Sequence, residues 1–211
     1  DEYLKERAGH IKYDQAVDFK AGAPKSGGTV YLSAADQDGM MVSFIQSNYA
    51  GFGSGVCIPG TGIHLQNRGA GFSLDPDSPN VVGPKKRPFH TIIPAFLMDN
   101  GSPLMSFGVM GGPMQAQGQI KIVVRGDRGQ RDPQEAIDAP RWSVEGGLNL
   151  VGEASLDNVL LSFLSELCHN VYTKTSNDAL GFGGAQLIRR LQNGFYIGGS
   201  ESRKDGQVVG F

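Results

Sequence analysis

The alternation of apolar and polar residues predicts a β-hairpin in the first quarter of the chain. A run from Thr29 to Ala35 alternates, the stretch DQDG at 36–39 has turn character, and a second apolar run extends from Met40 to Ile45. Two such runs joined by a short loop with glycine are typical of antiparallel strands. We therefore predict a hairpin over residues 29–47.

Helices are predicted where the apolar period lengthens. Residues 1–13 have the character of the end of a helix, and Met114–Arg125 is helix-like. A short helix is predicted within DPQEAIDAPRW, with Asp132 as its N-cap and Pro133 at its first position. Residues 156–169 are amphipathic, with apolar side chains at 156, 159, 160, 163, 164 and 167.

Further strands complete the expected secondary structure. One is predicted near 62–66, a second hairpin around Asn100-Gly101, and three closing strands near 171–175, 185–191 and 194–199. The intervening segments are a polar loop at 14–28, a glycine-rich bend at 51–55 and a proline-rich irregular loop at 73–90. Hairpins followed by helices and then by more strands favour the α+β class.

Length and glycine content narrow the possible architectures. The 211 residues suffice for one domain or a large piece of a bigger one. The chain opens on DEYLKERAGHI, which resembles the middle of a helix, so we expect a fragment of a longer protein. Its 31 glycines form clusters such as GFGSG and VMGG without a fixed period. This pattern excludes collagen and solenoid repeats and favours tight turns and close backbone approach to a ligand.

Charge and metal-ligating residues argue against several functions. The net charge of −2 gives no reason to expect nucleic acid or a membrane surface as partner. No stretch approaches the roughly 18 apolar residues of a transmembrane helix. Cys57 and Cys168 are too few and too distant for a disulfide framework, so we expect a cytoplasmic protein, with a periplasmic or secreted location left open. The histidines lack metal-ligand spacing and neither cysteine lies in a CxxC motif, so no metal and no cofactor are predicted.

Thr29 is the first candidate for chemistry, because it follows Gly27 and Gly28 at the start of a strand. An N-terminal threonine is nucleophile and base in one residue, since its own α-amine takes the hydroxyl proton. That amine has a pKa near ~8, which suits a base at neutral pH. Thr29 would gain it only by scission of the bond after Gly28; otherwise Thr29 is an ordinary strand residue.

Gly111 and Gly112 are the second candidate, in the stretch SFGVMGGPMQAQG. A strand ends at Met110 and a helix begins shortly after the two glycines. Consecutive N–H groups at such a junction point at a developing oxyanion without side-chain obstruction. The alternative is a plain strand-to-helix turn.

Six ordered stretches resemble one family. GGTVYLSAADQDG, FGSGVCIPGTGIHLQNR, KKRPFHTIIP, GVMGG, DPQEAIDAPRW and GGSESRKDGQVVG are similar to the small subunit of gamma-glutamyltransferase-type N-terminal nucleophile hydrolases. The resemblance extends from about residue 25 to the end. It implies a four-layer αββα sandwich and a precursor that cuts itself between Gly28 and Thr29. Residues 1–28 would then be the tail of a large subunit, and residues 29–211 the small catalytic subunit.

The resemblance also assigns roles to individual residues. Thr29 would be the nucleophile, Ser47 the hydroxyl that hydrogen-bonds it, and Gly111 with Gly112 the oxyanion hole. A second set would contact substrate: Asn67, Arg68, His90 and Thr91. His90 and Thr91 stand where the transpeptidase branch has adjacent serines, although residues after Pro88-Phe89 also commonly hydrogen-bond loop backbone.

One departure bears on the substrate. The glutathione-using branch carries two acidic residues where this chain has Ala70 and Gly71, and one of them holds the α-ammonium of the substrate. An ammonium group desolvated without a carboxylate is destabilised, so γ-glutamyl donors are expected to be poor substrates. The variant is closer to the transferase-like branch that includes oxamate amidohydrolase. Arg68 would there pair with the carboxylate of a small acidic amide; the alternative for Arg68 is a structural salt bridge.

The sequence therefore predicts a self-processed amide hydrolase or acyltransferase without cofactor. Its expected partner is the large subunit from the same precursor, which would complete the pocket for a small amide or γ-glutamyl substrate. Two alternatives stay open: a true gamma-glutamyltranspeptidase or glutathione hydrolase, and a scaffold of the same fold that neither processes nor catalyses.

Overall fold

The first hairpin forms as predicted and its register sets the site. The computed structural model describes residues 2–9, 29–128, 132–174 and 181–211. After the helix α1 (Glu2–Gly9), β1 (Thr29–Ala35) and β2 (Met41–Ser47) pair antiparallel, with Thr29 opposite Ser47. Because side chains alternate along a strand, Thr29, Tyr31 and Ser33 share one face of the hairpin.

A four-stranded antiparallel sheet forms the centre of the molecule. Its order is β3 (Ala95–Asp99), β4 (Ser102–Met110), β8 (Gly184–Arg190) and β9 (Tyr196–Ser200). The predicted hairpin around Asn100-Gly101 joins β3 to β4, and both of these residues have positive φ. The last two strands confirm those predicted near 185–191 and 194–199.

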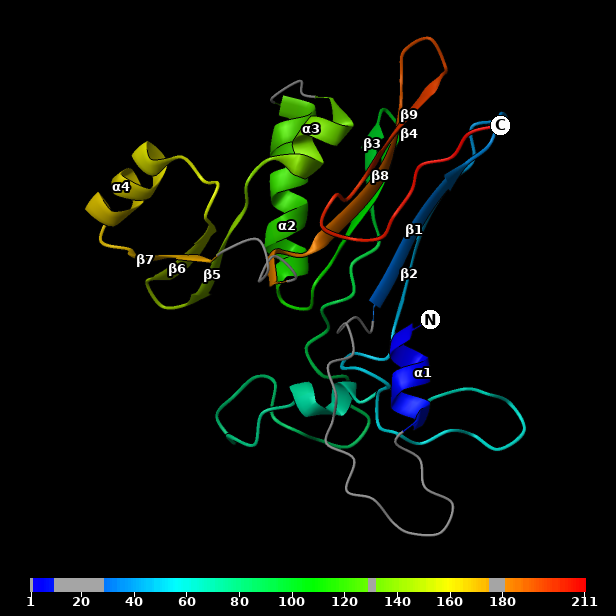
Figure 1. Cartoon of the computed structure of the whole chain (residues 1–211), viewed down its shortest axis with the longest axis vertical. Coiled ribbons are helices and arrows are strands. Elements are labelled where there is room, and N and C mark those ends of the chain that lie inside the picture. Colours follow the sequence, from blue (N-terminus) through cyan, green and yellow to red (C-terminus); the bar gives the residue numbers. More distant parts are fainter. Residues whose placement is uncertain (1, 10–28, 129–131, 175–180) are drawn as a thin grey trace.

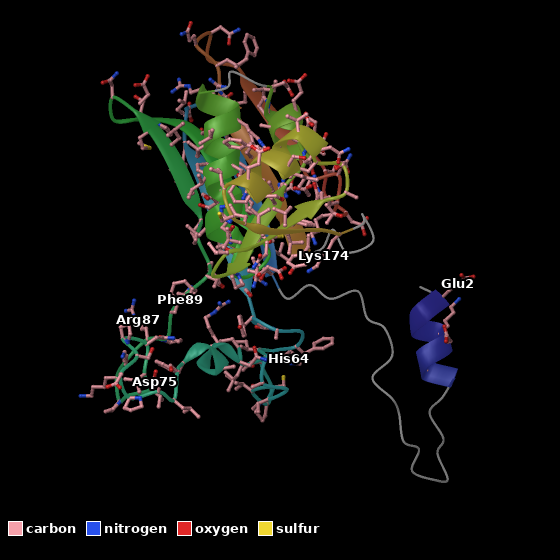
Figure 2. The ribbon with its side chains drawn as sticks, turned by 90° about the vertical axis from the view of Figure 1, so that its left-hand side faces the viewer. Glu2, His64, Asp75, Arg87, Phe89 and Lys174 are labelled. Atoms are coloured by element: carbon pink, nitrogen blue, oxygen red, sulfur yellow. The ribbon has the colours of Figure 1, made fainter. Side chains whose placement is uncertain are left out.

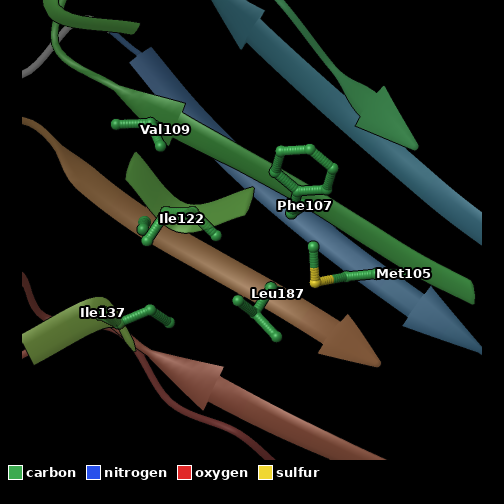
Figure 3. Packing of buried hydrophobic residues seen from close by; sticks show 7 residues of the cluster. Met105, Phe107, Val109, Ile122, Ile137 and Leu187 are labelled. Carbon is green, nitrogen blue, oxygen red and sulfur yellow. The ribbon is translucent and has the colours of Figure 1, made fainter. Parts of the chain in front are cut away.

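Helices cover one face of this sheet and the hairpin covers the other (Figure 1). The helix α2 (Met114–Val123) continues as a π-helical turn over Val124–Arg128, and α3 (Pro133–Asp138) follows. The Asp132 side chain accepts a hydrogen bond from the Gln134 N–H at 2.8 Å, which confirms the predicted cap. Between helices and sheet lies the main apolar core (Figure 3): Met105, Phe107, Val109, Ile122, Ile137, Ala185 and Leu187.

Tyr31 fixes the hairpin against β4. A Cβ on Gly108 would lie 2.4 Å from the Tyr31 ring, so only glycine admits the ring at this point. Two residues further along β1, the Ser33 hydroxyl donates to the Ser106 carbonyl of β4 at 3.3 Å. Since residue 31 lies over 108 and residue 33 over 106, the two strands run in opposite directions. The start of β1 is therefore brought to the end of β4, where the glycine pair begins.

A smaller sheet extends from the main layers. It consists of β5 (Trp142–Gly146), β6 (Asn149–Glu153) and β7 (Asn170–Lys174), and α4 (Asn158–Glu166) connects the parallel pair β6 and β7. The amphipathic pattern at 156–169 predicted this helix, and β7 was expected near 171–175. The strands β5 and β6 were missed, because they are short and joined through Gly146-Gly147, which interrupts the apolar pattern.

The segment between the hairpin and β3 forms a lobe beside the layers, in which Figure 2 labels His64, Asp75, Arg87 and Phe89. The strand predicted near 62–66 was wrong: His64 forms only an isolated bridge with Cys57, and backbone hydrogen bonds between loops take the place of a ladder. Residues 73–90 are irregular, as expected.

The described residues thus confirm the α+β class and supply helix, sheet and hairpin layers in that order. No helix in the described ranges is long and apolar enough to cross a membrane. Of the predicted helix at 1–13, residues 2–9 are helical and 10–13 lie outside the described residues, as does the polar loop at 14–28.

Candidate active site

Thr29 and Ser47 face one another at the open end of the hairpin. Their register as cross-strand partners brings Thr29 Oγ1 to 2.9 Å from Ser47 Oγ, and Thr29 donates the hydrogen bond. Gly28, on the other side of the expected cleavage point, lies outside the described residues. The two hydroxyls come together because the pairing of β1 with β2 leaves them on the same face.

The Ser47 oxygen receives two further hydrogen bonds. The Tyr49 backbone N–H donates to it at 2.9 Å and Arg68 Nη2 donates to it at 3.2 Å. Tyr49 has a φ of 75°, a conformation uncommon for a non-glycine residue, and its ring lies 4.9 Å from the Arg68 guanidinium carbon. Sequence reasoning missed Tyr49, because nothing in the local pattern shows this strained turn.

Arg68 lies behind Ser47 rather than on the surface. It begins the short 3-10 helix η1 (Arg68–Gly71), is only 5% exposed, and donates from Nη1 to Thr91 Oγ1 at 2.9 Å. Within the described ranges it forms no salt bridge with a carboxylate. The structural salt bridge considered from sequence is therefore not formed by the part of the protein described. The guanidinium instead contacts two hydroxyls and an aromatic ring.

Gly111 and Gly112 connect β4 to α2 in a conformation that glycine alone adopts readily. Their φ angles are +130° and +58°, and a Cβ on Gly111 would lie 2.9 Å from the Gly183 Cα. Their carbonyls accept hydrogen bonds from the N–H groups of Met114 and Gln115. No hydrogen bond between described residues uses the N–H of either glycine. Both groups lie at the positive end of the α2 dipole, where negative charge is stabilised.

Thr29, Gly111 and Gly112 line one cleft of about 1170 Å³. Tyr49 lines it as well, and the segment 202–209 forms another of its walls. Residues of β1, the glycine pair after β4 and the C-terminal segment thus meet around a hydroxyl and two N–H groups that form no hydrogen bond within the described part of the chain. Such a set is suited to attack on a carbonyl carbon with stabilisation of the resulting oxyanion.

Asn67 and His90 are engaged by loop backbone. The Asn67 side chain accepts from the Ala50 N–H at 3.0 Å and donates to the Gly53 carbonyl at 3.0 Å. His90 Nδ1 accepts from the Ile92 N–H at 3.2 Å, and its ring is exposed. Their assignment to substrate binding stays a prediction, whereas Thr91 is buried against Arg68.

A buried ionic cluster supports the cleft wall and was not predicted. Arg141 and Glu201 pair at 2.6 Å with both side chains 0% exposed, and Arg203 pairs with Glu201 and Glu153. Arg203, Lys204 and Asp205 line the cleft itself. Burial lowers the pKa of Lys204, which the charge of Glu201 opposes. The stretch SESRKDG supplies Glu201 and Arg203, but their partners Arg141 and Glu153 are about 50–60 positions away, so the sequence pattern does not indicate the cluster.

The acidic, histidine and cysteine side chains of the described residues form no group of three or more arranged to hold an ion. Cys57 and Cys168 are both free thiols on the surface.

These layers, with a threonine at the start of an inner strand, define the fold of an N-terminal nucleophile hydrolase. The chain belongs to the gamma-glutamyltranspeptidase family, whose model matches residues 1–211.

Two curated relatives share a similar percentage of identical residues with the chain. It is 37% identical over 207 residues to an oxamate amidohydrolase proenzyme of Klebsiella pneumoniae, and this match covers 93% of this chain and 39% of the relative. It is 38% identical over 216 residues to the glutathione hydrolase-like YwrD proenzyme of Bacillus subtilis, covering 99% and 40%. The chain therefore spans about two fifths of the length of these relatives. The resemblance to the oxamate-type branch agrees with the first of them.

Solved structures agree on the fold. A cephalosporin acylase from Bacillus halodurans superposes with a TM-score of 0.80 at 46% identity, over 99% of this chain and 38% of that one. A gamma-glutamyltranspeptidase from Pseudomonas nitroreducens gives a TM-score of 0.72 at 21% identity, over 86% of this chain and 97% of that one, which supports the fold alone.

Proposed function

We propose that the chain is the catalytic part of an amide hydrolase or acyltransferase in which Thr29 is the nucleophile. The observation that carries this proposal is the shared cleft: Thr29, Gly111 and Gly112 line the same space, and no hydrogen bond between described residues uses the N–H groups of the two glycines. The relatives named as proenzymes support maturation by scission between Gly28 and Thr29.

The reaction proceeds in two stages. The freed α-amine of Thr29 takes the Oγ1 proton, Oγ1 bonds to the substrate carbonyl carbon, and the carbonyl electrons move to the oxygen held by Gly111 and Gly112. The tetrahedral intermediate collapses to an acyl-enzyme as the amine leaves with the transferred proton. Water, or an amine acceptor in the transferase case, then releases the acyl group and restores the Thr29 hydroxyl.

For the substrate we favour a small amide bearing a carboxylate. Ala70 and Gly71 offer no anion to an ammonium group, whereas the buried charge of Arg68, which has no carboxylate partner among the described residues, lies behind Ser47 and favours an anionic substrate nearby. A γ-glutamyl substrate is the second candidate, favoured by the glutathione hydrolase-like name of one relative. A scaffold that neither processes nor catalyses is the third.

The partner is the large subunit produced from the same precursor. The outer face of the hairpin supports this, because four apolar side chains on it are at least two fifths exposed: Val30, Leu32, Val42 and Phe44. An apolar face of this kind on a strand pair is typical of a surface that is covered in the assembled protein. The remaining length of the relatives is ample to supply the cover.

The test uses the full-length precursor and its Thr29→Ala variant. Wild-type protein is expected to give two bands on a denaturing gel, the smaller beginning with Thr29, and to hydrolyse one of three substrate types: small dicarboxylic monoamides, γ-glutamyl-p-nitroanilide, or acylase substrates. Thr29→Ala is expected to stay uncut and inactive, while the exposed Thr173→Ala serves as a matched control with both properties intact. A single band together with no hydrolysis of any amide by wild type would support the scaffold.

A further inference from the structure

The most unusual feature of the site is the Ser47 hydroxyl oxygen, which has three hydrogen-bond donors around it. Ser47 Oγ accepts hydrogen bonds from Thr29 Oγ1, from the Tyr49 N–H and from Arg68 Nη2. A hydroxyl oxygen has two lone pairs, so three donors cannot all be held well. The Tyr49 N–H and the guanidinium can only donate, whereas the Thr29 proton has another destination in the α-amine.

We propose that Arg68 is a positioning residue that controls the direction of the Thr29–Ser47 hydrogen bond. This inference rests on the proposed function. Arg68 and the Tyr49 N–H each donate a hydrogen bond to Ser47 Oγ and so occupy both of its lone pairs. This weakens the hydrogen bond that Ser47 accepts from the Thr29 hydroxyl. The Thr29 proton moves to the α-amine, and the Ser47 O–H turns to donate to the Oγ1 atom that has lost it.

The exchange favours the reacting state over the resting state. Before proton transfer, three donors compete for one oxygen; afterwards, each donor has an acceptor and the anionic Oγ1 receives a charge-assisted hydrogen bond. The proton balance is complete, because the Thr29 proton goes to the amine and the Ser47 proton stays on Ser47. Oγ1 is then free to bond to the carbonyl carbon.

The surroundings of Arg68 suit this task. Thr91 Oγ1 accepts from its other terminal nitrogen at 2.9 Å and the Tyr49 ring lies against its plane, so the guanidinium is held in one orientation. Its charge is buried and unpaired among the described carboxylates. A positive charge placed one hydroxyl away from Thr29 disfavours the ammonium form of the α-amine, which lowers the pKa of that base. Arg68 does not itself line the cleft; the charged residues of the described chain that do are Arg203, Lys204 and Asp205.

The test compares Arg68→Gln, Arg68→Lys and Ser47→Ala in the full-length protein after self-processing. Each rate is divided by the concentration of processed protein. Arg68→Gln is expected to lower kcat by about ten- to a hundredfold, the effect of one hydrogen bond to a charged group. KM for an uncharged amide should stay within about twofold, and the acidic limb of kcat/KM should move to higher pH. The Arg68→Lys variant keeps the charge, so it should restore the position of that limb. Arg189→Gln is the control, since Arg189 donates to the Gly126 carbonyl and does not line this cleft.

A double-mutant cycle keeps the proposal testable if Arg68→Gln does not fold or process. Because Arg68 acts through Ser47, Arg68→Lys should change kcat little in a Ser47→Ala background. An equal loss in both backgrounds overturns the proposal. So does an unchanged kcat and pH profile with KM raised only for carboxylate-bearing amides, which would make Arg68 a substrate ligand alone. Activity in Thr29→Ala would instead refute the proposed function itself.

Discussion

Glu201 is enclosed by two arginines, and removal of its charge should destabilise the protein strongly. Its Oε2 atom accepts from Arg141 Nη2 at 2.6 Å and from the Ala185 N–H at 2.8 Å, and Oε1 accepts from Arg203 Nη1 at 2.5 Å. Burial lowers the pKa of the Arg141 guanidinium, and the charge of Glu201 opposes that shift. Glu201→Gln keeps the shape of the side chain and removes only its charge.

The expected loss follows from the position of Arg141. Its side chain is 0% exposed, and its Nε has no hydrogen-bond partner among the described residues. Without the negative charge of Glu201, a buried cation is left uncompensated, and breaking such a pair costs about 3–5 kcal/mol. For a protein of this size, that loss lowers Tm by roughly 6–20 °C.

The assay is chemical and thermal unfolding of wild type and Glu201→Gln, followed by circular dichroism. Glu145→Gln is the matched control, because Glu145 pairs with Lys174 at 3.1 Å with side chains 51% and 46% exposed. An exposed pair of this kind contributes about 0–1 kcal/mol. A loss of less than about 1 kcal/mol in Glu201→Gln, equal to that in the control, would refute the argument from burial.

Three further predictions concern other parts of the chain. Burial lowers the pKa of Lys121 from 10.5 to about 8 beside the Trp142 ring. The unfolded chain therefore binds more protons between these values, and the free energy of unfolding should gain about 2–3 kcal/mol from this group as pH rises from 8 to 10.5; Lys121→Met should abolish the gain in denaturant titrations. Gly108→Ala places a Cβ 2.4 Å from the Tyr31 ring, so it should lower both Tm and the rate of self-processing on gels, and unchanged values would show that the hairpin shifts freely. Gly71→Asp, at a position where a Cβ meets only ordinary contacts, should raise affinity for γ-glutamyl-p-nitroanilide in competition assays; unchanged affinity would reject that pocket assignment.

Much of the fold could be predicted because its signals are local. The alternation at 29–47, the Asn100-Gly101 turn and the Asp132 cap each depend on residues close in sequence, and each appears in the structure. The strand expected near 62–66 failed for the same reason. Its residues have strand-like composition, but in the described structure they meet residues 54–58 only through a few backbone hydrogen bonds and one isolated bridge, which is too little for a ladder.

The candidate site was predicted only in part. The resemblance brought Thr29, Ser47, Gly111 and Gly112 to attention, and the structure brings the first two into contact and lines one cleft with Thr29 and the glycines. The contact of Arg68 with Ser47 was not predicted. No periodicity indicates such a contact, because it depends on how the lobe folds back on the hairpin.

The sequence by itself determined the strand and helix patterns, the glycine-rich turns and the kind of chemistry that a threonine after two glycines suggests. Only the tertiary structure decided which groups meet. Arg141 and Glu201 are 60 positions apart, and Ser33 and Ser106 are 73 apart, yet each pair is in hydrogen-bond contact. Such contacts arise when whole layers pack to bury apolar surface, and the free energy of that packing depends on all the elements together rather than on any local run of residues.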